Sequence, residues 1–205
     1  MHSDEPSLLA HVEQLRGSIF PEGGLSNVIF VGKTKSDADM ASVLDAHREI
    51  VEEELNSNDQ LKITGLLMGQ ANSVLHFLEG PCQSLLNILS NLCKHVHFAN
   101  GTQAGRIIYS IEDRPERIYP EWYSSLIQER RSQVEDVTTE TAIDVVHNLA
   151  MGIIDVGRGL QRDANEDVDI TRYADKLPGK NLIIALSNSN DFFSLEVLSV
   201  LMLAI

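Results

Sequence analysis

Apolar residues change their spacing several times along this chain, and each spacing predicts an element. A compact apolar run at residues 28–31 is typical of a buried strand, and residues 40–55 carry apolar positions at helical spacing. Two further apolar segments, 61–68 and 74–79, are joined by the short polar loop 69–73, which predicts a β-hairpin. The first part of the chain therefore predicts the order strand, helix, strand, strand.

The middle of the chain continues this series. Gly80-Pro81 precedes an apolar stripe over residues 85–96, which predicts a second helix, because proline is tolerated in a first helical turn. Residues 106–111 predict a fourth strand, and residues 123–128 predict a fifth strand at the edge of the sheet. The complete order predicts an α+β fold of ferredoxin-like plan, in which an antiparallel-rich sheet carries both helices on one face.

Both faces of the predicted sheet are apolar. Along residues 74–79, even-numbered and odd-numbered positions point to opposite sides, and both sets are mostly apolar. The first strand repeats this pattern at residues 28–31. A sheet with water on one face would instead alternate apolar and polar residues. A second cover is therefore expected, and the C-terminal segment is favoured over a partner protein or a second copy.

The remainder of the chain is predicted to be helical. Residues 142–156 carry an amphipathic pattern, Leu177-Pro178-Gly179 is a break, and the apolar tail at 192–203 is expected to form a further helix. A short leading helix is expected at residues 7–20. The predicted organisation is an N-terminal segment, 1–26, an α+β domain, 27–129, and a helical C-terminal extension, 130–205.

The amino-acid composition limits the possible binding partners more than the possible reactions. With 30 acidic and 16 basic residues among 205, the formal charge is −14, which disfavours nucleic acid and anionic lipid and suits a soluble protein or a basic partner. Cys82 and Cys93 would lie about 16 Å apart on one helix, so free thiols in a reducing compartment are expected. The acidic N-terminus has no long apolar run, and residues 195–205 are too few to span a bilayer, so neither a leader peptide nor a membrane anchor is expected.

Several segments in order carry a family resemblance. They are the strand Val28-Ile29-Phe30, then Ile63-Thr64-Gly65-Leu66-Leu67, then Leu78-Glu79-Gly80, and finally Arg117-Ile118-Tyr119-Pro120-Glu121-Trp122. Over residues 27–125 they resemble the BLUF family of flavin-binding blue-light sensors. The resemblance implies the same strand and helix plan, with a flavin ring held between the two helices and against the sheet.

The positions that serve the flavin in that family are altered here. The resemblance places the family's tyrosine on the first strand at Phe30, its glutamine on the third strand at His76, and its asparagine before the isoleucine-threonine-glycine segment at Lys62. Phe30 has no hydroxyl, and His76 has no amide to rotate. Lys62 brings a strongly hydrated charge on a flexible stem. Loss of photochemistry and of flavin binding is therefore expected, with no cofactor, metal or catalytic residue assigned.

Other chemical groups give weaker signals. His95 and His97 are two residues apart, a spacing that diverges on a helix and does not suit a metal site. His47 lies on the apolar stripe of its helix, so a pair with His76 is an open alternative. Glu79 precedes a turn and is expected to order it. The sequence contains no phosphate loop, no hydrolase elbow and no Cys-x-x-Cys motif.

The sequence therefore predicts a non-enzymatic structural or interaction protein. The chain resembles flavin-less relatives of the BLUF family, which look like a testis-expressed group in animals. This resemblance implies a cytoplasmic scaffold in a ciliary or flagellar axoneme. The expected partners are proteins, such as a large cytoskeletal assembly, and not nucleic acid or a membrane. The alternative is a flavin- or small-ligand-binding sensor with altered chemistry. An enzyme that uses His47 and His76 is a third candidate, for which no reaction is indicated.

Overall fold

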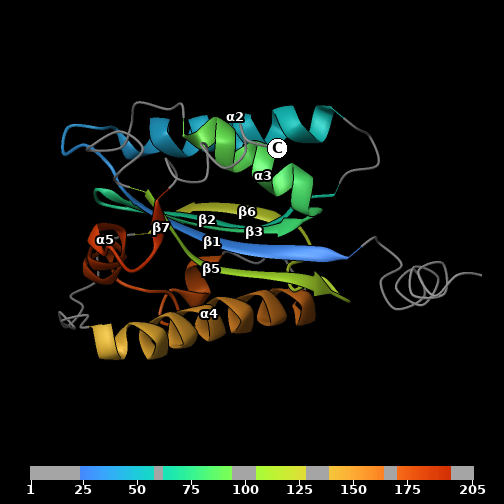
Figure 1. Ribbon diagram of the computed structural model, residues 1–205. Coiled ribbons are helices and arrows are strands. Elements are labelled where there is room, and N and C mark those ends of the chain that lie inside the picture. The colour runs from blue at the N-terminus through green and yellow to red at the C-terminus, as the bar shows by residue number, and fades with distance from the viewer. Residues whose placement is uncertain (1–23, 58–61, 94–104, 128–138, 164–169, 195–205) are drawn as a thin grey trace, which may run out of the picture.

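One sheet separates two layers of helices (Figure 1). The computed structural model describes residues 24–57, 62–93, 105–127, 139–163 and 170–194. On one face of the sheet lie α2, Met40–Asn56, and α3, Cys82–Leu92. On the other face lie α4, Thr139–Arg162, the short 3-10 helix η1, Ile170–Tyr173, and α5, Lys180–Asn188.

The strand order of the sheet is β6-β2-β3-β1-β5-β7. β1 pairs antiparallel with β3 and β5, β2 pairs antiparallel with β3, and β6 lies parallel to β2 at one edge. The first four strands with α2 and α3 follow the ferredoxin-like plan, so the predicted α+β fold class is confirmed. The strands span Leu25–Lys33 (β1), Thr64–Gln70 (β2), Ser73–Gly80 (β3), Gly105–Arg114 (β5), Trp122–Leu126 (β6) and Phe193–Ser194 (β7).

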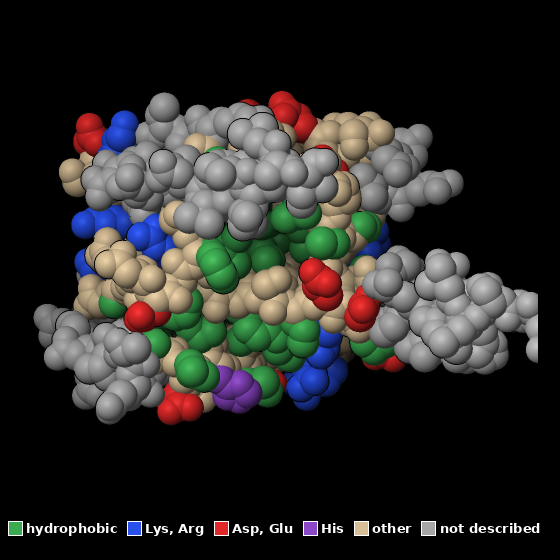
Figure 2. All heavy atoms as spheres, viewed as in Figure 1, with side chains coloured by type: hydrophobic (Ala, Val, Ile, Leu, Met, Phe, Trp, Pro, Cys, Tyr) green, Lys and Arg blue, Asp and Glu red, His purple; other side chains and the backbone are tan. Residues whose placement is uncertain are grey.

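The two faces of the sheet belong to different hydrophobic cores. On one side, Ile29 and Phe77 pack with Ile153 of α4, and on the other side Phe30 and Leu78 pack with residues of α2 and α3. Figure 2 shows apolar side chains gathered in two bands on the visible face, with backbone and other side chains between them. The C-terminal segment of the same chain therefore covers the second face, as the alternation predicts.

Helix α2 begins at Met40, where the apolar spacing predicts it. Asp39 is the N-cap, and its carboxylate accepts hydrogen bonds from the backbone amides of Ala41 (3.4 Å) and Ser42 (3.3 Å). The Ser42 hydroxyl also donates to this carboxylate at 2.7 Å. These bonds to Ser42 lower the pKa of the Asp39 carboxyl. Asp39 is an effective cap because its side chain satisfies two amide groups of the first turn.

The β2–β3 hairpin is tighter than the predicted five-residue loop at 69–73. Pairing continues to Gln70 opposite Ser73, which leaves Ala71 and Asn72 in the turn. Ala71 has a φ of 50°, in the left-handed region that two-residue hairpin turns require. The Asn72 carbonyl accepts a hydrogen bond of 2.9 Å from the backbone amide of Thr34, which joins this turn to the end of β1.

The predicted helical tail is wrong in its described part. Phe193–Ser194 form β7, which pairs antiparallel with Arg106 and Ile107 of β5. The open edge of β5 satisfies the backbone groups of these two residues, and an apolar pattern alone does not reveal such an edge. The rest of the tail and the predicted leading helix at residues 7–20 lie outside the described residues.

Helix α4 makes a close approach at Gly157. A Cβ placed on Gly157 would lie 2.7 Å from side-chain atoms of both Ile118 and Tyr119. Tyr119 is fully buried, so its ring has little room to move. The missing side chain at this position therefore sets how near α4 can lie to the loop between β5 and β6.

We expect Gly157→Ala to lower the free energy of unfolding by about 1–3 kcal/mol, because the added methyl group overpacks the Tyr119 ring. This loss would oppose the gain of up to about 1 kcal/mol that alanine has over glycine in a helix. Urea denaturation of the full chain measures the change. The exposed neighbour Arg158→Ala is the control and should change stability by less than about 0.5 kcal/mol. A net stabilisation by Gly157→Ala would contradict the close approach.

Candidate functional site

Two of the three altered flavin positions meet in the structure. Phe30 on β1 and His76 on β3 are direct cross-strand partners, and both are 0% exposed. Lys62 is exposed and precedes β2, whereas the β2 residue opposite His76 is Leu67. About 16 Å of extended chain therefore separates Lys62 from the level of His76. The structure joins the first pair and leaves Lys62 at the surface.

A cluster of rings surrounds His76 on the α2 side of the sheet. The His76 ring centroid lies 5.7 Å from that of His47 on α2 and 5.9 Å from that of Trp122 on β6. His47 is also 0% exposed, and its ring lies 6.5 Å from the ring of Phe30. The pairing of His47 with His76, an open alternative in the sequence, is therefore present as a buried contact.

One hydrogen bond defines the protonation of His76. Trp122 Nε1–H donates to His76 Nε2 at 3.2 Å, so Nε2 is unprotonated and the proton of the neutral ring lies on Nδ1. His76 Nδ1 has no hydrogen-bond partner in the described part of the chain. Burial lowers the pKa of His76 well below its usual range, and the nearby His47 lowers it further. His76 is therefore a neutral acceptor within the core.

The space where the resemblance would place a flavin ring is filled by side chains. Between the two helices and the sheet, Phe30 and Leu78 pack against apolar residues of α2 and α3. The side chains of this core are at most slightly exposed to solvent, and several are not exposed at all. As they stand, these residues do not fit an isoalloxazine ring, because they occupy its volume and offer few polar groups for its edge. The helix residues in this core are Ile50, Val51, Leu85, Ile88, Leu89 and Leu92.

On the opposite face, Glu79 binds the backbone of a distant loop. Its carboxylate is 0% exposed and accepts hydrogen bonds from the backbone amides of Ile118 (2.9 Å) and Tyr119 (3.1 Å) and from the hydroxyl of Thr64 (2.9 Å). With its amide nitrogen facing Glu79, Asn27 donates a further bond at 3.2 Å. Glu79 thus orders a loop some forty residues away, rather than the turn that directly follows it.

Tyr119 carries this connection onward to α4. Its hydroxyl donates a hydrogen bond of 2.8 Å to the Ile153 carbonyl, and its ring lies 5.2 Å from that of Phe77. Burial raises the pKa of the Tyr119 hydroxyl far above its usual range, and Glu79 and Tyr123 raise it further. The hydroxyl is therefore a permanent donor, and it links the loop to a helix backbone rather than to a substrate.

The remaining sequence candidates do not assemble into a site. His95 and His97 lie outside the described residues. Cys82 is the first residue of α3 and Cys93 is its C-cap, so the two thiols lie at opposite ends of one helix. Within the described ranges, no three His, Cys, Asp or Glu side chains come together as a metal site. The same part of the chain holds no helix long and apolar enough to cross a membrane.

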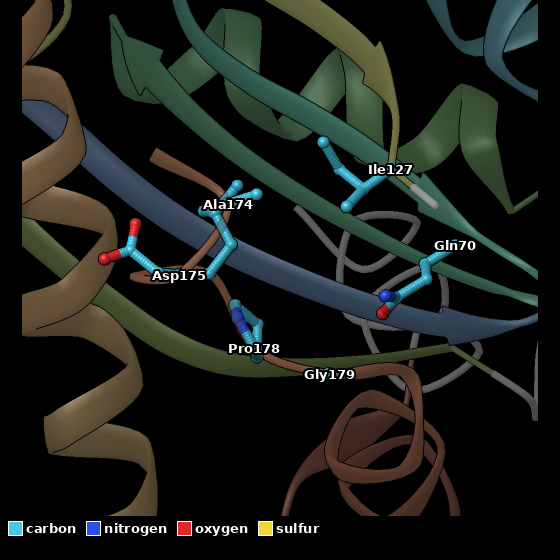
Figure 3. Close-up of a pocket in the computed structure, with 7 residues that line it drawn as sticks. Gln70, Ile127, Ala174, Asp175, Pro178 and Gly179 are labelled. Carbon is cyan, nitrogen blue, oxygen red and sulfur yellow. The ribbon is translucent and has the colours of Figure 1, made fainter. Parts of the chain in front are cut away.

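A cavity of about 230 Å³ lies between the sheet and the α5 side of the molecule (Figure 3). Gln70 at the end of β2 and Ile127 after β6 face the segment that leads into α5. Sequence reasoning did not find this cavity, because its walls come from separate parts of the chain and no motif connects them. The wall residues of that segment are Ala174, Asp175, Leu177, Pro178 and Gly179.

The family described as testis-expressed protein 47 matches residues 24–197. The chain belongs to this family. The match covers the sheet and both helical layers, so it includes the C-terminal helices as well as the first six elements. The predicted resemblance to a testis-expressed group is thereby confirmed.

Solved structures with some similarity to this chain include light sensors. A bacterial light-regulated adenylyl cyclase is 15% identical with a TM-score of 0.41. The matched region covers 67% of this chain but only 36% of the cyclase chain. The BLUF domain of BlrP1, from Klebsiella pneumoniae, is 14% identical with a TM-score of 0.41, covering 74% of this chain and 87% of that chain. The BLUF protein BlrB has the same identity and TM-score, 14% and 0.41, over 73% and 94% of the two chains. Because these TM-scores are low, we take the fold class from the sheet and helices of this chain.

We expect Glu79→Gln to lower the free energy of unfolding by about 1.5–3 kcal/mol, because the new amide group would point a donor at backbone donors. Chemical denaturation with circular dichroism measures this loss. Glu52→Gln, on the exposed surface of α2, removes the same charge and is the matched control, with an expected change of less than about 0.5 kcal/mol. Equal stability of the two variants would show that the carboxylate does not hold the loop.

Proposed function

We propose that this chain is a non-enzymatic interaction module that uses a BLUF-like frame without flavin photochemistry. Its partners are proteins, and its place is a ciliary or flagellar assembly, where it acts as a scaffold component. The observation that carries this proposal is the closed core at the altered flavin positions: Phe30 and His76 are both fully buried. A group sealed from solvent and substrate does not take part in chemistry on a ligand.

The use of the buried polar groups supports a structural role. The Nε2 atom of His76 is occupied by Trp122, and the carboxylate of Glu79 is occupied by backbone amides. A general acid or base needs a proton position that faces a substrate. These two polar groups are instead bonded to their own fold.

Two further observations support the choice of partner. The family to which the chain belongs is named for expression in testis, the tissue in which flagellated sperm cells form. The formal charge of −14 favours association with a basic protein surface over nucleic acid. Neither observation requires an enzymatic activity.

We expect the purified protein to be colourless and to leave the fluorescence of added flavin mononucleotide unchanged. The physical reason is that a ring would have to displace the apolar side chains packed between α2 and α3. The measurement is an absorbance spectrum followed by a flavin titration read by fluorescence anisotropy. The double variant Phe30→Tyr with His76→Gln supplies the polar groups without the space and should also fail to bind. A yellow protein, or saturable binding at micromolar flavin, would refute the loss of the cofactor.

The cellular part of the proposal has its own test. In ciliated cells, the tagged full chain should remain with the axoneme after detergent extraction of the membrane and soluble contents. Its release at high salt would follow from an electrostatic contact made by this acidic chain. Complete extraction with the soluble proteins at low salt would rule out the axonemal scaffold, while leaving the flavin result unaffected.

A small-ligand sensor is the second candidate, and the cavity beside Gln70 favours it. Its volume of about 230 Å³ is too small for a flavin, so the ligand would be a smaller molecule. This function would use the opposite face of the sheet from the altered flavin positions, because Gln70 shares the side of β2 that carries Leu66 and Met68.

A further inference from the structure

Helix α2 meets the sheet at a contact between two buried histidines. His47 projects from α2 and His76 from β3, with ring centroids 5.7 Å apart and neither side chain exposed. Around them, α2 covers the apolar residues Leu67 and Val74 of the sheet. Such a contact can respond to pH, because histidine is the side chain whose charge changes near neutral pH.

Among the described residues, the groups that surround His76 include none that would stabilise a positive charge on it. The groups that face it are His47 from α2, Trp122 from β6, Phe30 from β1 and Leu67 from β2. Of these four, His47 is the only titratable one, and a second proton there would repel the first. The ring of Trp122 meets His76 by its edge, at 66°, and so presents the positive rim of the indole rather than its negative face.

We propose that the His47–His76 contact is an acid-sensitive latch that holds α2 against the sheet. A proton can enter the neutral ring of His76 only at Nε2, because Nδ1 already carries one. Protonated Nε2 becomes a donor and opposes the Trp122 Nε1–H, so the hydrogen bond of 3.2 Å is lost. The charged ring then lies beneath an apolar helix surface, and separation of α2 from the sheet lets water reach it.

The latch acts on one layer of the molecule. Among the described residues, the buried histidines are His47 and His76, and both lie on the α2 side of the sheet. Met40, Val43 and Leu44 of α2 would lift away and uncover Leu67 and Val74, while the α4 layer keeps its packing. Acid therefore opens a defined apolar surface on β2 and β3 instead of unfolding the whole chain.

The sign of the pH dependence follows from the buried state of His76. Because burial holds its pKa below that of the unfolded chain, about 6.5, the native state binds fewer protons than the opened state. The contribution of the latch to stability is complete above pH 6.5 and is lost as the pH falls below this value. Opening of α2 and uptake of the proton are one event.

The single tryptophan of the chain reports on this event. We expect the fluorescence of Trp122 in the full chain to change in one transition below pH 6.5, since a protonated imidazole beside an indole quenches it. Hydrogen exchange, corrected for its intrinsic pH dependence, should rise about tenfold per pH unit in residues 40–56 and stay unchanged in residues 139–162.

Three variants separate the latch from general acid unfolding. His76→Gln keeps an acceptor for Trp122 but takes no proton, so the transition should disappear. His47→Gln removes the neighbouring charge that lowers the pKa of His76 and should move the transition to higher pH. His147→Gln, on the exposed surface of α4, is the matched control and should titrate like the native chain.

Each result decides the proposal. Equal exchange in residues 40–56 and 139–162 across the pH range would overturn it, and so would a transition that persists in His76→Gln. If His76→Gln does not fold, the His47→Gln titration decides, because an unshifted midpoint would contradict a charge shared between the two rings.

Discussion

The buried carboxylate of Glu79 connects the sheet to the layer that covers its second face. It receives backbone hydrogen bonds from Ile118 and Tyr119, and Tyr119 in turn donates to the Ile153 carbonyl of α4. A carboxylate without these donors would be strongly unfavourable at this depth. The same donors would be unsatisfied without the carboxylate. The carboxylate and the backbone amides therefore require each other, so the loop has one favourable position. The position of the loop in turn determines how α4 packs.

The two helical layers are held in physically different ways. On the α4 side, Gly157 and Gly159 let the helix approach Tyr119 and Tyr173 closely, so the packing is rigid and depends on shape. On the α2 side, the contact includes His47 and His76, so its strength depends on protonation as well as on area. The α4 layer therefore keeps its packing when the pH falls, whereas the packing of the α2 layer depends on the protonation of its histidines.

The sequence predicted the features that depend on period and failed for those that depend on tertiary partners. Alternation correctly separated Phe30 from Ile29 along β1 and Leu78 from Phe77 along β3, because the side-chain period of a strand is fixed by its geometry. It could not assign β7, whose two residues pair with an edge formed by distant residues. The hydrogen-bond donors to Glu79 could not be predicted for the same reason, because the backbone amides of residues 118 and 119 have no sequence signature.

The structure makes Phe30 and His76 cross-strand partners, a pairing that follows from the register of β1 against β3. The resemblance did not show that Trp122 would bond to His76 or that His47 would face it, since both contacts need the docking of α2 and β6. An imidazole can satisfy an indole N–H while remaining neutral, which an apolar replacement cannot do. The neutral imidazole of His76 thus completes the Trp122 hydrogen bond inside a buried core, and in the proposed latch this same bond makes the core sensitive to acid.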